Sequence, residues 1–188
     1  MKKEMDFALS GEIKIDSLAD IAEVALQQDQ FDLAIKYAEQ GLELILPMHA
    51  QNVRFYCILM RAHNGLDNFD ECEKFFQLAT EILYHHLGQS HPLHVTVYSL
   101  MSYLLIPKGK FEDALYLYKS ALLCSQRALG SYHIQTAETH MNFGQFYLRW
   151  DKRDNALQQF EQAHLIYDNY FTNKQRETKS VLVADAAM

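Results

Sequence analysis

The sequence predicts an all-α fold of about four antiparallel helical hairpins, stacked into a right-handed superhelix of the α-solenoid type. The phrase Leu-Gly-Gln-Ser-His at 87–91 recurs as Leu-Gly-Ser-Tyr-His at 129–133, which is 42 positions later. Self-similarity on this scale indicates a repeat architecture. Glycine and proline are scarce, at 7 and 3 of 188 residues, so the long periodic segments between these phrases read as helices.

A second recurring pattern joins small and large residues at spacings of four and three, which places them on one helical face. In the third unit the triplet is Ala114, Tyr118 and Ala121. The matching triplets in the fourth, second and first units are Ala156, Phe160 and Ala163; Cys72, Phe76 and Ala79; Ala34, Ala38 and Gly41. The upstream helix of each unit has its own inward-packing position, occupied in order by Ala22, Met60, Ser102 and Gly144.

The chain begins with residues 1–15, which have no clear period and are expected to be a flexible lead-in or a partial helix. The repeat domain is expected at 16–171. Asp16 or Ser17 can cap its first helix, because a short oxygen-bearing side chain accepts from free amides of the first turn. That helix is expected to end near Gln28, and its partner is expected to run from Phe31 to the residue before Pro47.

Three more hairpins follow, and turn residues or prolines separate their helices. The expected units are 16–47, 50–88, 92–130 and 134–171, and the later helices are 50–64, 69–87, 93–106, 111–129, 134–150 and 153–171. Residues 172–188 contain a short apolar run near Val181. They are expected to form a C-terminal capping helix or a tail, because a repeat stack needs a cap over its last face.

The pattern of the units resembles the tetratricopeptide repeat. In that family the first helix carries a small residue, and the second helix carries two small residues around an aromatic one. The unit length and the Leu-Gly-x-x-His phrase resemble the 42-residue repeats of kinesin light chains, whereas typical tetratricopeptide units have about 34 residues. The third and fourth units match best. The resemblance implies a non-enzymatic fold that binds other proteins.

Composition limits the classes of partner. The formal net charge of −7 argues against broad nucleic-acid binding, which needs clustered basic residues. Cys57, Cys72 and Cys124 are odd in number and widely spaced, so we interpret them as thiols of a reducing compartment. The chain has no apolar run long enough for a membrane span, and its N-terminus does not read as a signal peptide. We therefore expect a cytoplasmic protein that does not insert into membranes.

The sequence offers little chemistry. His85, His86, His91 and His94 crowd together, but carboxylate or thiolate ligands at suitable spacing are missing, so no metal site is expected. Acidic residues at the starts of second helices complement the helix dipole. Nucleophile elbows, phosphate loops and dinucleotide fingerprints are absent from the sequence. We expect no enzyme activity and no cofactor.

Stacked hairpins form a concave face lined by first helices, and the register predicts which residues lie on it. The predicted partner-binding residues are Arg54, Arg61, Asn64, Tyr103, Asn142, Gln145 and Arg149. The remaining groove positions are Ala19, Glu23, Leu26, Gln27, Cys57, Gly65, Ser99, Ile106, Met141 and Leu148, with Asp16, Thr96 and Glu138 one turn earlier. Tyr103 with Arg54 and Arg61 suits an aromatic or acidic segment. In kinesin-light-chain-like repeats the position of Asn142 contacts the peptide backbone.

The leading interpretation is a non-catalytic adaptor that binds a peptide segment of a partner in its concave groove. One alternative is the C-terminal helical part of a larger enzyme, because the tails of SET- and MYND-domain lysine methyltransferases also resemble tetratricopeptide repeats. Another is a self-associating scaffold. The sequence does not decide the oligomeric state.

Overall fold

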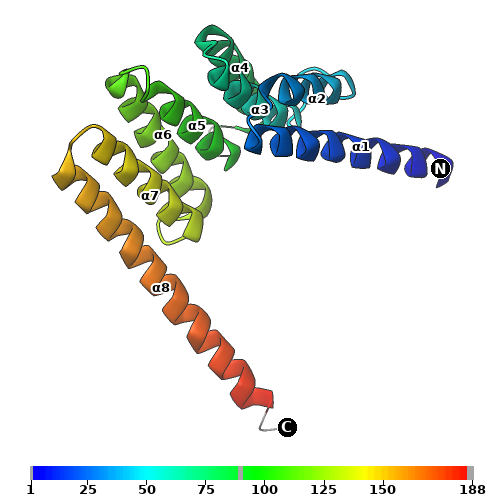
Figure 1. Ribbon diagram of the computed structural model, residues 1–188. Coiled ribbons are helices and arrows are strands. Elements are labelled where there is room, and N and C mark those ends of the chain that lie inside the picture. The colour runs from blue at the N-terminus through cyan, green and yellow to red at the C-terminus, as the bar shows by residue number, and fades with distance from the viewer. Residues whose placement is uncertain (1, 89–90, 186–188) are drawn as a thin grey trace. The chain divides into compact units, whose positions relative to one another are not determined.

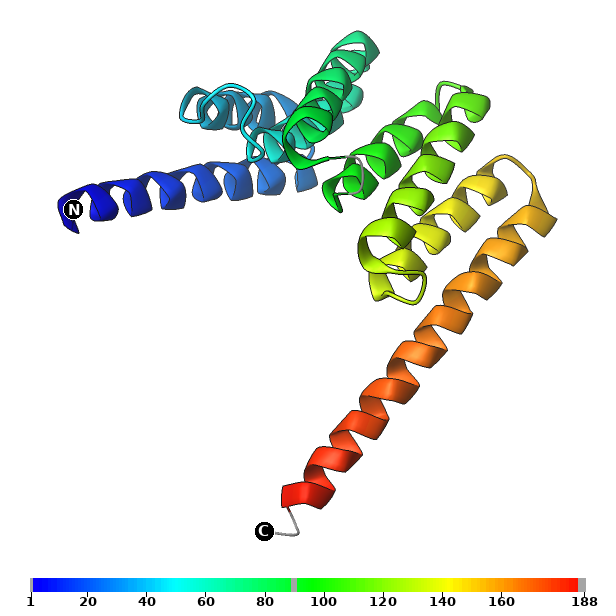
Figure 2. The same cartoon turned by 180° about the vertical axis from the view of Figure 1, so that it is seen from behind.

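A computed structural model describes the backbone of residues 2–88 and 91–185, and the side chains of residues 13–88 and 91–172. Every regular element in these ranges is a helix, and the helices pair as antiparallel hairpins (Figures 1 and 2). This confirms the all-α repeat fold. The chain divides into two compact units, Met1–Gln89 and Ser90–Met188, and each is described by itself.

The first unit consists of two hairpins. Its helices are α1 (Lys2–Gln27), α2 (Phe31–Glu43), α3 (Asn52–Gly65) and α4 (Phe69–Ile82), followed by a π-helical turn, η1 (Leu83–Leu87). Besides its hairpin partner, α3 packs against α2 and α1. The core forms where the first helices α1 and α3 meet α2, with Ala22, Ala34, Leu59 and Ala62 fully buried.

The second unit repeats this arrangement with two further hairpins. Its helices are α5 (Leu93–Leu105), α6 (Phe111–Leu129), α7 (Ile134–Arg149) and α8 (Arg153–Asp185). The helix α7 packs on α6 and also contacts α5, so the two first helices of the unit are neighbours. An aromatic cluster holds α6 against α7, in which Tyr118 stacks on Phe143 with ring centroids 5.5 Å apart.

The small positions pack as the 42-residue pattern predicts. Ala22, Met60 and Ser102 are fully buried. Gly144 lies against the ring of Phe160, the aromatic member of the triplet in the same hairpin. Ala156 and Ala163, which flank Phe160, are also buried. The pattern therefore marks the surfaces on which paired helices approach each other.

All four hairpins turn in the same way. One residue in each turn has a positive φ, namely Asp29 (56°), Asp67 (59°), Gly109 (71°) and Asp151 (54°). The next amide then bonds back to a carbonyl five residues earlier: Gln30 to Ala25, Asn68 to His63, Lys110 to Leu105 and Lys152 to Tyr147. Aspartate and glycine tolerate this left-handed conformation better than most residues, so they end the first helices at a fixed place.

Two helices are longer than expected. The helix α1 begins at Lys2 and not at Asp16 or Ser17. Ser17 is inside the helix, where its hydroxyl donates to the carbonyl of Ile13 (2.7 Å), so it does not cap the N-terminus. Residues 1–15 contain no proline and one glycine, so little interrupts a helix there. At the other end, the segment from residue 172 is helical and continuous with α8 as far as Asp185, and residues 186–188 lie outside the described part.

When η1 is counted as the end of the helix that begins with α4, the ends of the remaining helices differ from the expected ends by at most three residues. The largest of these differences is in α2, which ends at Glu43 where Leu46 was expected. Among the described residues, none of the helices combines the length and the apolar character that crossing a bilayer requires.

Candidate functional site

Four of the predicted partner-binding residues meet in one pocket of the second unit. Tyr103 comes from α5, and Asn142, Gln145 and Arg149 come from one face of α7, at spacings of three and four. The pocket has a volume of about 230 Å³, and its other lining residues are Ser99, Leu100, Ile106, Tyr118 and Phe146. The two neighbouring first helices therefore form the walls, as the register predicts.

The wall on one side carries a stacked cation and ring. The guanidinium carbon of Arg149 lies 5.1 Å from the centroid of the Tyr103 ring, which is the geometry of a cation–π contact. Tyr103 is 49% exposed, so both groups stay accessible from solvent. A contact of this kind contributes about 0.5–1 kcal/mol at an exposed site. It holds the guanidinium at the pocket edge, where it can still donate to a carboxylate.

The floor of the pocket is aromatic. Tyr118 of α6 is 3% exposed and lies against Phe146, with ring centroids 5.0 Å apart. Burial raises the pKa of the Tyr118 hydroxyl to about 12, although the positive charge of Arg149 opposes the shift. The hydroxyl therefore stays neutral at physiological pH. The pocket thus combines an apolar floor with a polar, positively charged edge.

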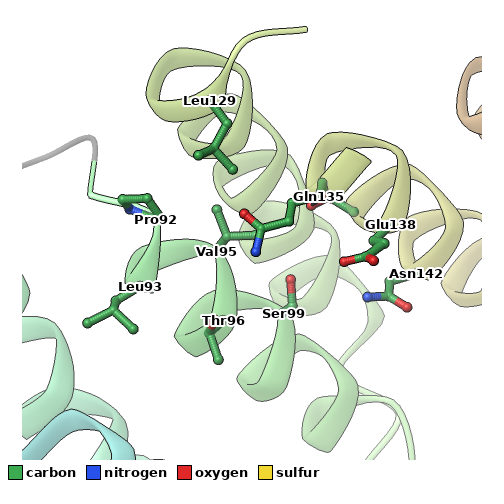
Figure 3. Close-up of a pocket in the computed structure, with 10 residues that line it drawn as sticks. Pro92, Leu93, Val95, Thr96, Ser99, Leu129, Gln135, Glu138 and Asn142 are labelled. Atoms are coloured by element: carbon green, nitrogen blue, oxygen red, sulfur yellow. Dashed lines mark hydrogen bonds between the residues drawn. The ribbon is translucent and has the colours of Figure 1, made fainter. Parts of the chain in front are cut away.

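A second pocket of about 380 Å³ continues along the same two helices toward their N-terminal ends. Its walls include Thr96 and Val95 of α5 and Gln135 and Glu138 of α7. Figure 3 shows the side chains of Gln135, Glu138 and Asn142 on α7 facing the α5 side, where Ser99 lies. We call the two pockets together the α5–α7 trough.

Ser99 and Asn142 line both pockets and so mark the middle of the trough. The Ser99 hydroxyl oxygen is buried, and no hydrogen-bond partner for it is found among the described residues. Buried hydroxyls in proteins are nearly always hydrogen-bonded, because a buried polar atom left unpaired costs free energy. The middle of the trough therefore holds a hydroxyl that is covered from solvent and has no partner among the described residues.

The other three predicted residues, Arg54, Arg61 and Asn64, share a face of α3 in the first unit, at spacings of seven and three. Arg54 is already engaged by acids of α1. Its Nε donates to Glu23 (3.0 Å), one Nη donates to Asp20 (2.6 Å), and Asp16 lies 3.8 Å from the other Nη. The hydrogen bond to Glu23 raises the pKa of Arg54. A partner carboxylate would have to compete with these acids.

Some expected groove positions are instead part of the core. Ala19 and Leu26 of α1 are only 1% and 6% exposed, and both belong to the core of the first unit. Ile106, at the end of α5, is 8% exposed. These three side chains are therefore less open to a partner than the register predicted.

The second unit also matches a known family. The tetratricopeptide repeat family model matches residues 93–169, which span α5 to α7 and half of α8. Residues 93–169 are therefore similar in sequence to tetratricopeptide repeats. None of the curated protein sequences is detectably similar to the chain.

Solved structures extend the likeness in fold to most of the chain. BtubC (BKLC) from P. vanneervenii aligns with a TM-score of 0.69 at 17% identity, over 90% of this chain and 76% of that one. A putative kinesin light chain of Podosopora anserina with nearly identical TPR-like repeats gives 0.64 at 17% identity, over 83% and 76%. A variant of that same protein gives 0.66 at 16%, over 91% and 92%. The fold of the chain is that of kinesin-light-chain-like tetratricopeptide repeats.

The family match covers both hairpins that build the α5–α7 trough. This agrees with the sequence pattern, in which the third and fourth units resemble tetratricopeptide repeats most closely. Tetratricopeptide repeats stack hairpins to form extended surfaces for binding other proteins. The fold therefore supports a protein-interaction module in general.

Proposed function

We propose that this chain is a non-catalytic adaptor that binds an extended peptide segment of a partner protein in the α5–α7 trough. The shape of the trough carries the proposal, because one hollow between α5 and α7 is lined by four of the predicted residues, Tyr103, Asn142, Gln145 and Arg149. A peptide backbone lying between α5 and α7 offers amides and carbonyls to the exposed side chain of Asn142.

The ends of the trough differ in charge and so suggest which peptide it accepts. Arg149 stacked on Tyr103 marks one end, and Glu138 lines the other. An acidic or aromatic side chain fits the first end, where the guanidinium supplies donors and Tyr118 and Phe146 supply an apolar floor. A basic side chain fits beside Glu138. The opposite peptide direction would place like charges together.

The proposal includes the cytoplasm as its compartment. The structure describes Cys57, Cys72 and Cys124 outside any disulfide, which suits a reducing environment. The acidic net charge of −7 supports a protein partner over a nucleic acid. Arg61 and Asn64 stay predicted contacts of the first unit.

Proteins retained from a cell extract by the purified chain provide the test. We would compare the wild type with Arg149→Glu, Tyr103→Ala and Ser99→Leu, the last of which fills the middle of the trough. Arg127→Glu is the matched control, because it makes the same charge change on an exposed arginine of α6 that lines neither pocket. Circular dichroism checks that all variants keep their helicity.

We expect a partner that the wild type and Arg127→Glu retain and that the three trough variants lose. A peptide from that partner should then bind the wild type directly and should lose affinity with Arg149→Glu when it contains an acidic residue. Equal retention by the wild type and all three trough variants would show that the trough is not the binding site.

A further inference from the structure

Within each unit, the first helix of the second hairpin covers the second helix of the first hairpin with one set of positions. On α3 these are Phe55, Leu59 and Ala62, and on α7 they are Thr139, Phe143 and Phe146. Each of the six is at most 3% exposed. The equivalent residues of α1, the first helix of the chain, lie 38 positions before those of α3.

These equivalents on α1 are Ser17, Ile21 and Val24, and they are exposed. Ile21 is 44% exposed and Val24 is 50% exposed. Apolar side chains that other first helices bury are thus presented to solvent by α1. We call this surface the α1 face.

The last helix of the chain has the complementary feature. On α6, the helix that α7 covers, Leu115 is half-buried. Its equivalent on α8, 42 positions later, is Leu157, which is 58% exposed, and Phe171 at the position of Leu129 is 53% exposed. Terminal repeats of a solenoid need a polar outer face for solubility, and this helix presents apolar residues there. We call this surface the α8 face.

We propose that the α1 face of one copy of this chain covers the α8 face of a second copy, as α7 covers α6. The α8 face has the repeat positions with which α6 meets α7, and the α1 face has the repeat positions with which α7 meets α6. The second unit therefore already contains an interface of this kind. They use residues other than those of the α5–α7 trough, so this inference stands apart from the proposed peptide binding.

Charge complementarity favours a second copy as the occupant. In the α6–α7 interface the hydroxyls of Ser125 and Thr136 lie 2.8 Å apart. The same geometry would bring Lys14 of one copy to Tyr167 of the other, next to Asp168. A lysine opposite an aromatic ring and a carboxylate is a favourable pair at a surface.

The other end of the interface gives a second opposite pair. Phe111 stacks on Trp150 with ring centroids 5.6 Å apart and an interplanar angle of 4°. Arg153 and Gln28 occupy the equivalent positions, and Asp29 follows Gln28. The antiparallel register therefore brings Arg153, whose Nε lies 3.3 Å from Asp151 of its own copy, next to Asp29, and brings Lys14 next to Asp168. The reversed register would oppose like charges, so the charges select one direction.

The lengths of α1 and α8 fit the same register. By its alignment with α7, which begins at Ile134, α1 would start at residue 12, yet it begins at Lys2. By its alignment with α6, which ends at Leu129, α8 would end at residue 171, yet it continues to Asp185. In the antiparallel arrangement these two extra lengths of helix lie next to each other and extend the contact.

The association would be head to tail. Each copy carries one α1 face and one α8 face, so a pair of copies leaves one of each unused. Heterologous contacts of this kind produce open chains of copies unless the rotation closes a ring. Their average length rises with protein concentration.

Sedimentation velocity at a low and a high protein concentration tests the proposal. We expect the wild type to shift to larger species at the high concentration, whereas Ile21→Glu and Leu157→Glu each stay monomeric. Leu165→Glu is the matched control on α8. Its equivalent on α6, Leu123, stays 47% exposed although α7 covers α6, so this position lies outside the covered face. Leu165 itself is 49% exposed. This variant should associate like the wild type.

Mixing the two monomeric variants gives the sharper result. Ile21→Glu keeps its α8 face and Leu157→Glu keeps its α1 face, so an equal mixture should form a dimer and no larger species. Because both residues are exposed, the substitutions should leave helicity unchanged, which circular dichroism checks. A monomeric wild type at both concentrations, a mixture that stays monomeric, or an equal loss of association with Leu165→Glu would overturn the proposal.

Discussion

Phe160 of α8 lies directly against the backbone of Gly144 on α7. A Cβ atom built on Gly144 would come within 2.5 Å of the Phe160 ring, closer than two carbon atoms can approach. In an open helix, replacing glycine by alanine would stabilise by about 1 kcal/mol. Here overpacking opposes that gain, and it typically costs about 1–3 kcal/mol. We therefore expect Gly144→Ala to lower the free energy of unfolding, measured by urea denaturation.

The neighbouring residue supplies the control. Gln145→Ala changes an exposed position of the same helix and should leave the free energy of unfolding nearly unchanged. Combining Gly144→Ala with Phe160→Leu makes room for the new methyl group, so the double variant should lose less than the two single losses added together. Full additivity would contradict the close approach as the cause.

Three histidines act at equivalent places in front of first helices. The Nδ1 atoms of His49, His91 and His133 each accept from the backbone amide two residues later, and each of these distances is 3.2 Å. At the N-terminus of α7 this bond satisfies an amide that has no partner within the helix. We expect His133→Ala to lower the free energy of unfolding by about 0.5–1 kcal/mol, because the cap is lost.

An asparagine at the same position can also accept from the first turn, so His133→Asn should retain most of the stability. Thermal unfolding followed by circular dichroism distinguishes the two variants. If His133→Asn and His133→Ala melt at the same reduced temperature, the histidine contributes through its size and not through the hydrogen bond.

Arg54 joins α3 to α1 through acids that are themselves well exposed. The exposed fractions of the side chains are 41% for Arg54, 70% for Asp20 and 40% for Glu23. Exposed ion pairs typically contribute less than about 1 kcal/mol each, and salt screens them. We expect Arg54→Ala to cost about that much stability in dilute buffer and less in high salt, measured by urea denaturation at two ionic strengths.

A double-mutant cycle of Arg54→Ala with Asp20→Asn isolates the pair. A coupling energy that is positive in dilute buffer and smaller in high salt would agree with a screened surface network. A coupling that salt does not change would show instead that Arg54 acts mainly through the packing of its aliphatic stem.

The repeat pattern of the sequence was sufficient for most of the fold, because its period, 42 positions between the later units and 38 between the first two, marks the positions where paired helices approach. The pattern missed His49, since the phrase around it lacks the Leu-Gly pair, although His49 stands 42 positions before His91. It also missed the length of α1. Residues 1–15 have no clear apolar period, and the helical state of such a segment depends on local propensity and neighbouring contacts, which periodicity does not report.

The helical register predicted which residues of the site share a face, but it did not predict contacts that depend on how the helices pack. Tyr103, Asn142, Gln145 and Arg149 meet because they share faces of neighbouring helices. The engagement of Arg54 by Asp20 and Glu23 depends on how α1 packs on α3, across more than thirty residues of sequence. The sequence did not predict that Tyr118 lines the pocket, because this residue belongs to the triplet that marks the packed face of its helix. The unpartnered state of Ser99 is a three-dimensional property.

Cys57 provides a chemical probe of the α3 surface. Burial raises the pKa of its thiol to about 12, and the charge of Arg61 opposes this only in part. The thiolate is the reactive form, so we expect slow alkylation by iodoacetamide at neutral pH in the folded protein and fast alkylation in urea. Mass spectrometry of the labelled peptides measures both rates. Equal rates in the two conditions would show that the thiol is not protected.

Tyr118 should make the second unit sensitive to alkali. Burial raises the pKa of its hydroxyl from 10.0 to about 12, so the unfolded chain loses this proton at lower pH than the folded one. The stability that comes from keeping the folded hydroxyl neutral is fully present below pH 10 and is lost as the pH rises through about 12. Urea midpoints should therefore fall as the pH rises above 10.

The variant Tyr118→Phe tests this, because phenylalanine cannot ionise and the fall in midpoint should become flatter. Part of the fall should remain, because burial also raises the pKa values of Tyr56, Tyr147 and Tyr167. An identical fall in the wild type and in Tyr118→Phe would mean that the Tyr118 hydroxyl reaches solvent in the folded protein, and the trough would then have a wet floor.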